Sequence, residues 1–236
     1  NLAMEVPEIL LPAPGIDLHR WAVIACDQYT SEPEYWEAVD QLVADRPSTL
    51  RLVFPEVYLE DAGGDARIAD INASMKQYLA DDVLVSQGRG FVLIDRKTSH
   101  VPSRKGLVVA LDLEAYDYRP GSKTLIRTTE GTIVDRLPPR IRVRENAAVE
   151  LPHIMVLIDD PEQTVIEPLC KAELEKVYDF ELMQDGGHLR GARRPRARDA
   201  APPPPSNRRR PCPGSSRRGG RASSWRRGPA WSHACR

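Results

Sequence analysis

Large apolar residues stop abruptly near the end of this chain. The 46 residues from Gly191 onward contain no Val, Ile, Leu, Met, Phe or Tyr, but they hold 13 Arg, no Lys, eight Pro and one acid, Asp199. The preceding 190 residues carry 20 basic and 33 acidic side chains, so this body has a formal charge of −13 and the tail one of +12. A folded core can form only in the body, because the tail buries too little apolar surface to offset its ordering entropy.

Three explanations of the tail, residues 191–236, stay open. A basic arm for nucleic acid has such a composition, and so does a plain linker. Translation of a GC-rich gene in a shifted frame also yields Arg, Pro, Ala, Gly and Ser, and the abrupt change of composition favours this explanation. The tail is predicted to be disordered, and removal of residues 192–236 is predicted to leave the unfolding of the body nearly unchanged.

The composition also excludes several classes of protein. No apolar run reaches the roughly 18 residues of a membrane span, and no basic segment leads into an apolar run as in a secretory signal. The four cysteines, at positions 26, 170, 212 and 235, have no metal-binding spacing. We therefore expect reduced thiols, a cytoplasmic location, no contact with a membrane and no structural metal.

Three segments of the body are predicted to be helical. Residues 31–46 have an apolar stripe at helical period, and Ser31 and Glu34 have the spacing of a capping box. A second amphipathic pattern covers residues 66–80. A long helix is predicted over residues 159–183.

Five apolar segments are predicted to be strands: residues 21–25, 50–54, 90–95, 106–113 and 154–158. The third and fourth should pair, and the fifth is apolar on both faces, which is typical of a central strand in a covered sheet. Strands that alternate with helices indicate an α/β or α+β domain over residues 1–190, with a mixed sheet covered by helices. That length is enough to bury one sizeable core.

Several long segments resemble one protein family, in the same order. They are WAVIACDQYTSEPEYW (21–36), RLVFPEVYLE (51–60), RIADINASMKQYL (67–79), GLVVALDLEAYDY (106–118), LIRTTEGTIVDRLPPRIRVRE (125–145), LPHIMVLIDDP (151–161) and GGHLRG (186–191). On these segments, residues 4–191 resemble the Domain of Unknown Function 1015 family, whereas the tail does not. Family members continue with ordinary globular sequence, so the resemblance implies that the domain lacks a C-terminal part here.

The family name assigns no activity. The resemblance implies an association with serine biosynthesis and a relation to the ParB/sulfiredoxin-like fold, a group that includes nucleotide-dependent kinases of free serine. The catalytic residues of those kinases match no positions in this sequence. The resemblance therefore gives a direction for the function and no residue roles.

The first candidate site is the stretch 26–31, predicted to follow a strand and precede a helix. Ligands of open sheets gather at the carboxyl ends of strands, and the free N–H groups of a helix N-terminus attract anions. Asp27 is the candidate catalytic base, and Gln28, Thr30 and Ser31 are candidate ligand-binding residues. An ordinary turn capped by Ser31 is the alternative.

The second candidate site is the stretch 127–140, which is dense in Arg, Thr and acids. Guanidinium groups bind phosphate through paired hydrogen bonds, and glycine allows a ligand to approach the backbone. Its candidate residues are Arg127, Glu130, Gly131, Thr132, Asp135 and Arg136, with Glu130 as a proton acceptor. The alternative is a solvated hairpin whose charge pairs continue into an exposed strand at Arg142 and Arg144.

The third candidate is the glycine-rich stretch 186–191, predicted to be a flexible turn. His188 and Arg190 are the candidate phosphate ligands in this turn, and a loop without its partner segment is the alternative. His153 and Asp159 would lie about 20 Å apart at the ends of one strand, so they share no metal. Asp159 or Asp160 is more simply a helix cap.

Two functions stay open. The first is a phosphotransferase that acts on a small hydroxyl metabolite such as serine with ATP or ADP and Mg²⁺. The second is a non-catalytic module that binds an anionic metabolite through the same residues. Both predict that Asp27, Arg127, Glu130 and Arg136 converge on one cleft. The acidic body argues against a nucleic-acid partner.

Overall fold

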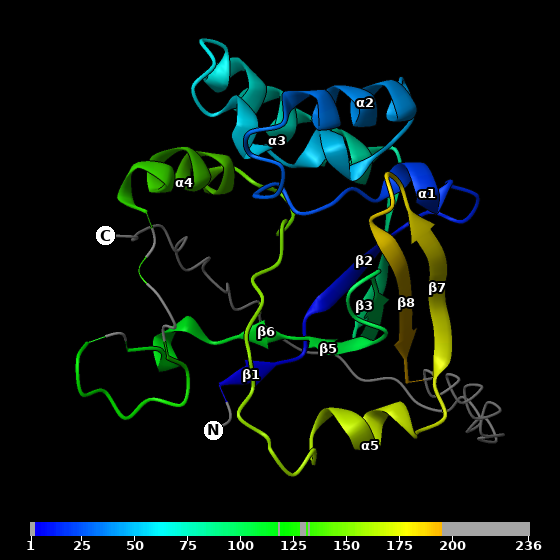
Figure 1. Cartoon of the computed structure of the whole chain (residues 1–236), viewed down its shortest axis with the longest axis vertical. Coiled ribbons are helices and arrows are strands. Elements are labelled where there is room, and N and C mark those ends of the chain that lie inside the picture. Colours follow the sequence, from blue (N-terminus) through cyan, green and yellow to red (C-terminus); the bar gives the residue numbers. More distant parts are fainter. Residues whose placement is uncertain (1–2, 118, 128–130, 132, 195–236) are drawn as a thin grey trace, which may run out of the picture. The chain divides into compact units, whose positions relative to one another are not determined.

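The structure is a computed structural model that describes residues 3–117, 119–127, 131 and 133–194. The contacts divide the chain after Arg196, and the described residues all belong to the first unit. Figure 1 shows its elements, which in chain order are β1 (Met4–Glu5), β2 (Glu8–Pro12), α1 (Leu18–Trp21), α2 (Pro33–Val43), η1 (Thr49–Leu52), η2 (Glu56–Tyr58), α3 (Gly64–Ala80), β3 (Leu84–Arg89), β4 (Val92–Lys97), β5 (Arg104–Val108), β6 (Ala110–Leu111), η3 (Leu113–Ala115), η4 (Val134–Arg136), α4 (Leu137–Glu145), α5 (Ile166–Cys170), β7 (Glu175–Leu182) and β8 (Gly187–Arg193).

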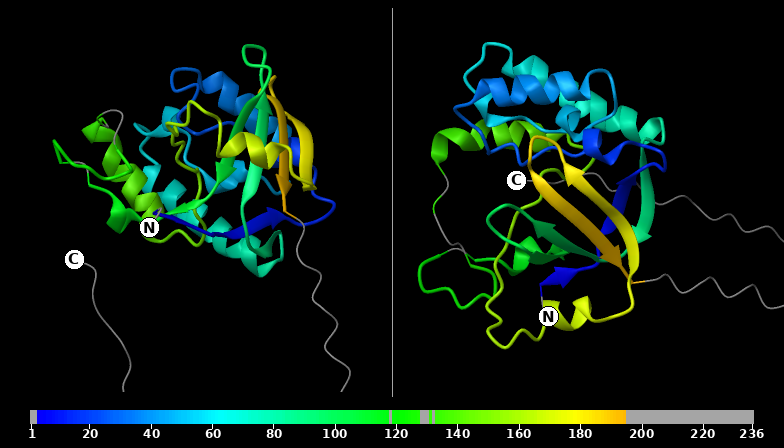
Figure 2. Two further views of the ribbon diagram at one scale, coloured as in Figure 1. Left: turned by 90° about the horizontal axis from the view of Figure 1, so that it is seen from below. Right: turned by 45° about the vertical axis from the view of Figure 1, so that its right-hand side comes forward.

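The strands of the described chain form three antiparallel sheets. The largest has the order β5-β4-β8-β7, while β1 pairs with β6 and β2 pairs with β3. Figure 2 shows the β7–β8 hairpin beside β4 and β5. The predicted combination of helices and sheet is confirmed, and the antiparallel pairing makes it an α+β structure.

Two apolar clusters hold the helices. Around α3, the buried side chains of Ile71 and Met75 pack with Leu52. On α2, Val39 and Val43 pack with Met183, at the turn between β7 and β8. In Figure 1 the helices α2 and α3 accordingly lie beyond that end of the hairpin.

The two amphipathic helices are confirmed as α2 and α3, but the capping box is not. The N-cap of α2 is Glu32, and no side chain caps this end. Pro33 occupies the first turn, where the missing N–H costs no hydrogen bond. Ser31 is exposed, and its hydroxyl makes no capping hydrogen bond to this helix.

The strands predicted at 21–25 and 50–54 do not form. Trp21 ends α1, and its carbonyl accepts hydrogen bonds from the hydroxyls of Ser48 and Thr49, both at 2.9 Å. Ser48 also caps the 3₁₀ helix η1 through its hydroxyl, which accepts from Leu50 N at 3.2 Å. These side-chain bonds satisfy backbone groups that a sheet would otherwise pair, so Trp21 and residues 52–54 are buried without strand partners.

The predictions for residues 154–183 are wrong. Residues 154–158 form no strand, and the long helix is replaced by the short α5 and by β7. In β7 the side chains of Tyr178, Phe180 and Leu182 face inward and alternate with exposed acids. That period of two is typical of a half-buried strand and outweighs the helical interpretation.

The end of β8 provides a prediction about truncation. Ala192 is buried and pairs with Leu93, so the ordered strand extends beyond the expected boundary at Gly191. Truncation after Arg196 should leave the melting temperature within about 2 °C, because the removed residues hold no large aliphatic side chain. Truncation after Arg190 should lower it by about 5–10 °C, through loss of strand pairing worth about 2–3 kcal/mol. Scanning calorimetry of both forms would contradict this if the two shifts were equal.

Candidate functional site

A buried carboxylate, Glu56, holds two arginines that follow it by about 80 residues. Its side chain is 3% exposed. Arg136 Nη1 donates to Glu56 Oε2 at 2.6 Å, and Arg140 donates to Oε1 from Nε at 2.8 Å and also from Nη2. A carboxylate removed from water needs such compensation, so this contact fixes all three side chains.

The local sequence explains how the two arginines share one acceptor. Pro138 and Pro139 occupy the first turn of α4, where proline is tolerated. Arg136 is the N-cap of this helix and Arg140 lies four residues later, so both side chains project from the same face. The exposed strand expected at Arg142 and Arg144 is wrong, because both residues lie in α4.

The Cys26–Asp27 turn meets the same glutamate. Glu56 N donates to Cys26 O at 2.8 Å. Burial, and then the charges of Asp27 and Glu56, raise the pKa of Cys26 to about 11. The hydrogen bond with Glu56 raises the pKa of Arg140, and the charge of Asp27 adds to this effect. One electrostatically coupled cluster therefore contains Cys26, Asp27, Glu56, Arg136 and Arg140, which we call the Glu56 cluster.

The other candidates of the first stretch lie around this turn. Asp27 is exposed, and Gln28 Nε2 donates to its Oδ1 at 3.4 Å. The carbonyl of Gln28 accepts from Trp36 Nε1 at 3.3 Å, which ties the turn to α2. Thr30 is half-buried and Ser31 is exposed. Their roles as ligand-binding residues stay predictions.

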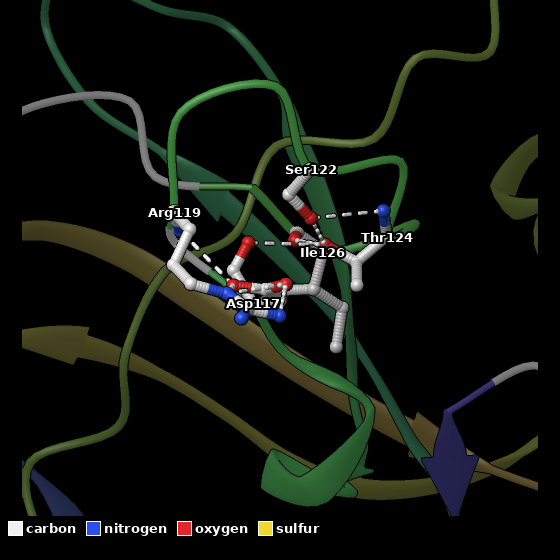
Figure 3. A network of polar contacts seen from close by, with 5 residues as sticks. All are labelled: Asp117, Arg119, Ser122, Thr124 and Ile126. Carbon is white, nitrogen blue, oxygen red and sulfur yellow. Dashed lines mark hydrogen bonds and ion pairs between the residues drawn. The ribbon is translucent and has the colours of Figure 1, made fainter.

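Arg127 directly follows a loop with its own polar network, and Figure 3 shows the residues of that network from Asp117 to Ile126. The Asp117 carboxylate accepts from Arg119 Nη2 at 2.7 Å, and this hydrogen bonding lowers the pKa of Asp117. Thr124 Oγ1 donates to Ile126 O at 2.9 Å. Arg127 Nε donates to Thr124 O at 3.3 Å, so its one contact in the described chain lies within this loop and not at the Glu56 cluster.

The remaining candidates of the second stretch differ in what the structure describes. Glu130 and Thr132 lie outside the described residues. Gly131 is exposed, and Asp135 is exposed beside Arg136 in η4. In the described chain, Arg136 and the Asp27 turn are linked only through Glu56, which binds Arg136 by its side chain and Cys26 O by its backbone N–H; convergence of the predicted residues on one cleft stays a prediction.

His188 and Arg190 lie in the strand β8 and not in a flexible turn. Arg190 is paired with Asp95 on β4 and with Asp179 on β7, which forms a row of alternating charge across the sheet. His188 Nε2 lies 2.7 Å from Asp179 Oδ1, and this hydrogen bond lowers the pKa of Asp179. Beside His188 is a hollow of about 270 Å³, lined by Lys97, Thr98, Ser99, Glu181, Gly187 and His188.

Sequence reasoning missed Glu56. It is the one charged residue in the otherwise apolar run 52–59, LVFPEVYL. A buried glutamate is rare unless it is paired, so its position in such a run is the feature that identifies it. Its partners lie too far along the chain for any local pattern to show them.

The side chains that donate hydrogen bonds to Glu56 are the cationic guanidinium groups of Arg136 and Arg140. Among the residues that the structure describes, His, Cys, Asp and Glu side chains form no group of three or more that would suit a metal ion.

In the part of the chain that the structure describes, no helix has both the length and the apolar character needed to cross a bilayer.

The raised pKa of Cys26 provides a chemical prediction. A pKa of about 11, against 9.0 for a free thiol, leaves about 100-fold less thiolate at pH 8. Alkylation of Cys26 by iodoacetamide should therefore be at least about 100-fold slower in the folded chain than in denaturant. Peptide mass spectrometry measures this rate for each cysteine separately. Equal rates in the folded and denatured chains would contradict the burial of this thiol.

Comparison with known proteins identifies one family. The family described as "Protein of unknown function (DUF1015)" matches residues 10–195, which is most of the chain. No curated protein and no solved structure matches the chain.

Proposed function

The chain belongs to the DUF1015 family, and we propose that its Glu56 cluster binds the phosphate group of a small metabolite. The observation that carries this proposal is the fixed pair of arginines beside the Cys26–Asp27 turn. The buried Glu56 carboxylate holds Arg136 and Arg140 by ion pairs. The exposed fractions of the two arginine side chains are 39% and 43%. Two guanidinium groups held in place are suited to bidentate recognition of an oxyanion.

The hydrogen-bond donors of the two arginines support an anionic ligand. Arg136 and Arg140 carry two positive charges, which Glu56 and Asp27 balance within the cluster, so the attraction for an anion comes from the guanidinium N–H groups that face solvent. The hydrogen bonds to Glu56 use Nη1 of Arg136 and both Nε and Nη2 of Arg140, so other N–H groups of each fork stay available. A phosphate group at these N–H groups would accept hydrogen bonds from both arginines.

The chemistry that this arrangement supports best is phosphoryl transfer to a small hydroxyl metabolite such as serine. The hydroxyl oxygen forms the new bond to phosphorus as the bond to the leaving nucleoside phosphate breaks. The hydroxyl proton passes to the exposed Asp27 carboxylate. Arg136 and Arg140 balance the charge on the transferred group.

Lysine variants test phosphate binding without removing the charges that Glu56 needs. Arg136→Lys and Arg140→Lys should each weaken the binding of ADP or phosphoserine by about tenfold or more, because lysine lacks the planar fork. Arg142→Lys is the matched control on the same helix, since Arg142 pairs with the exposed Asp65. Isothermal titration calorimetry measures the binding, and equal losses for Arg142→Lys would contradict a site at the Glu56 cluster.

A second variant separates catalysis from binding. Asp27→Asn should retain nucleotide binding and abolish transfer of phosphate from ATP or ADP to serine, measured by ³¹P NMR. If the unmodified chain binds phosphate but transfers none to any hydroxyl acceptor, the cluster is a metabolite-binding or regulatory site. A chain that binds no phosphorylated compound would overturn both forms of the proposal.

A further inference from the structure

Residues 154–158 are an apolar segment that the described chain leaves uncovered. Their sequence is Ile-Met-Val-Leu-Ile, and each side chain is between 50% and 77% exposed. In Figure 1 they belong to the extended stretch between α4 and α5. None of the three sheets of the described chain includes them. An exposed run of five large apolar residues is uncommon in a soluble monomer and marks an interaction surface.

Both faces of the segment are apolar. Ile154, Val156 and Ile158 would project from one face of an extended chain, and Met155 and Leu157 from the other. Such a segment is typical of a strand with neighbours on its edges and faces. The chain's own tail cannot provide them, because residues 195–236 contain no Val, Ile, Leu, Met, Phe or Tyr.

We infer that residues 153–159 pair with the same residues of a second copy of this chain, as antiparallel strands centred on Val156. This register places Ile154 opposite Ile158 of the second copy. It also places Met155 opposite Leu157, so all five apolar residues meet apolar partners.

Polar complementarity selects this register. With Val156 on the two-fold axis, each His153 faces Asp159 of the other copy, so at both ends of the paired strands an imidazole N–H can donate to a carboxylate. A slip by two residues in either direction places an acid or His153 opposite an apolar residue. The contact is isologous, because the same patch meets itself, and it closes as a dimer.

The first test is the oligomeric state of the full chain and of Val156→Asp. Sedimentation equilibrium over a micromolar concentration range should show a monomer–dimer equilibrium. Val156→Asp places two carboxylates face to face on the axis and should weaken dimerisation by about tenfold or more. Leu113→Asp is the control, since Leu113 is 72% exposed and lies outside the segment. A monomer at every concentration, or a dimer unaffected by Val156→Asp, would overturn the inference.

A charge exchange tests the register itself. His153→Glu places a glutamate opposite Asp159 and should weaken the dimer. The double variant His153→Glu/Asp159→Lys replaces the repulsion by a pair of opposite charges and should return the dissociation constant to within about threefold of the original. A dimer that responds to Val156→Asp but gains nothing from the second charge change would overturn this register. Circular dichroism of each variant verifies that the monomer stays folded.

Discussion

Replacing both Arg136 and Arg140 by alanine is expected to lower the free energy of unfolding by about 3–4 kcal/mol at pH 7. The change leaves the buried Glu56 carboxylate without its partners, and removing the partners of a buried charge costs about 3–5 kcal/mol. Urea unfolding measures the difference.

Two controls accompany this variant. Adding Glu56→Gln to the double variant should recover part of the loss, since it removes the buried charge. Arg142→Ala/Arg144→Ala removes two exposed ion pairs on the same helix, to Asp65 and Glu150, and should cost no more than about 1 kcal/mol. If the two double variants were equally destabilised, Glu56 would not be the anchor of α4.

Gly187→Ala is expected to destabilise the fold by about 3 kcal/mol or more. Gly187 has a φ of +93°, which L side chains rarely adopt, and a Cβ there would lie 2.2 Å from Lys97 O. The strain of the backbone alone costs about 1–3 kcal/mol, and relief of the clash must move β8 away from β4. Thermal unfolding measures the loss.

Gly106→Ala is the matched control on the same sheet. A Cβ at Gly106 would meet nothing within 4 Å, and Gly106 pairs with Ile94 in an ordinary strand. Its effect should stay within about 0.5 kcal/mol. Equal effects at the two positions would show that general loss of chain flexibility, and not the Gly187 geometry, decides stability.

The sequence predicted the elements whose apolar period is long and continuous. The stripes of α2 and α3 extend over three or more turns, and both helices form. The β4–β5 hairpin was equally visible, because two apolar segments flank a turn-rich connection. Short apolar runs were ambiguous, and at 21–25 and 50–54 the hydroxyls of Ser48 and Thr49 provide the hydrogen bonds that strands would have needed.

The candidate site was only half visible from the sequence. The turn at Asp27 and the cation Arg136 are local features, so the sequence around each of them is enough to make it a candidate. Glu56, which joins them, was not identified, because its contacts connect residues about 80 positions apart. His188 and Arg190 were placed in a turn because two glycines precede them, whereas Gly187 instead allows β8 to approach Lys97 closely.

The most direct test of a single anion site at the Glu56 cluster is hydrogen exchange of the full chain with and without saturating inorganic phosphate. The site predicts slower exchange of amides in residues 26–28 and 134–140 together, although more than 100 residues separate the two segments. The same protection should disappear in Arg136→Lys/Arg140→Lys while the exchange of α3 stays unchanged. Protection confined to other segments, or none at saturating phosphate, would contradict a shared site built on Glu56.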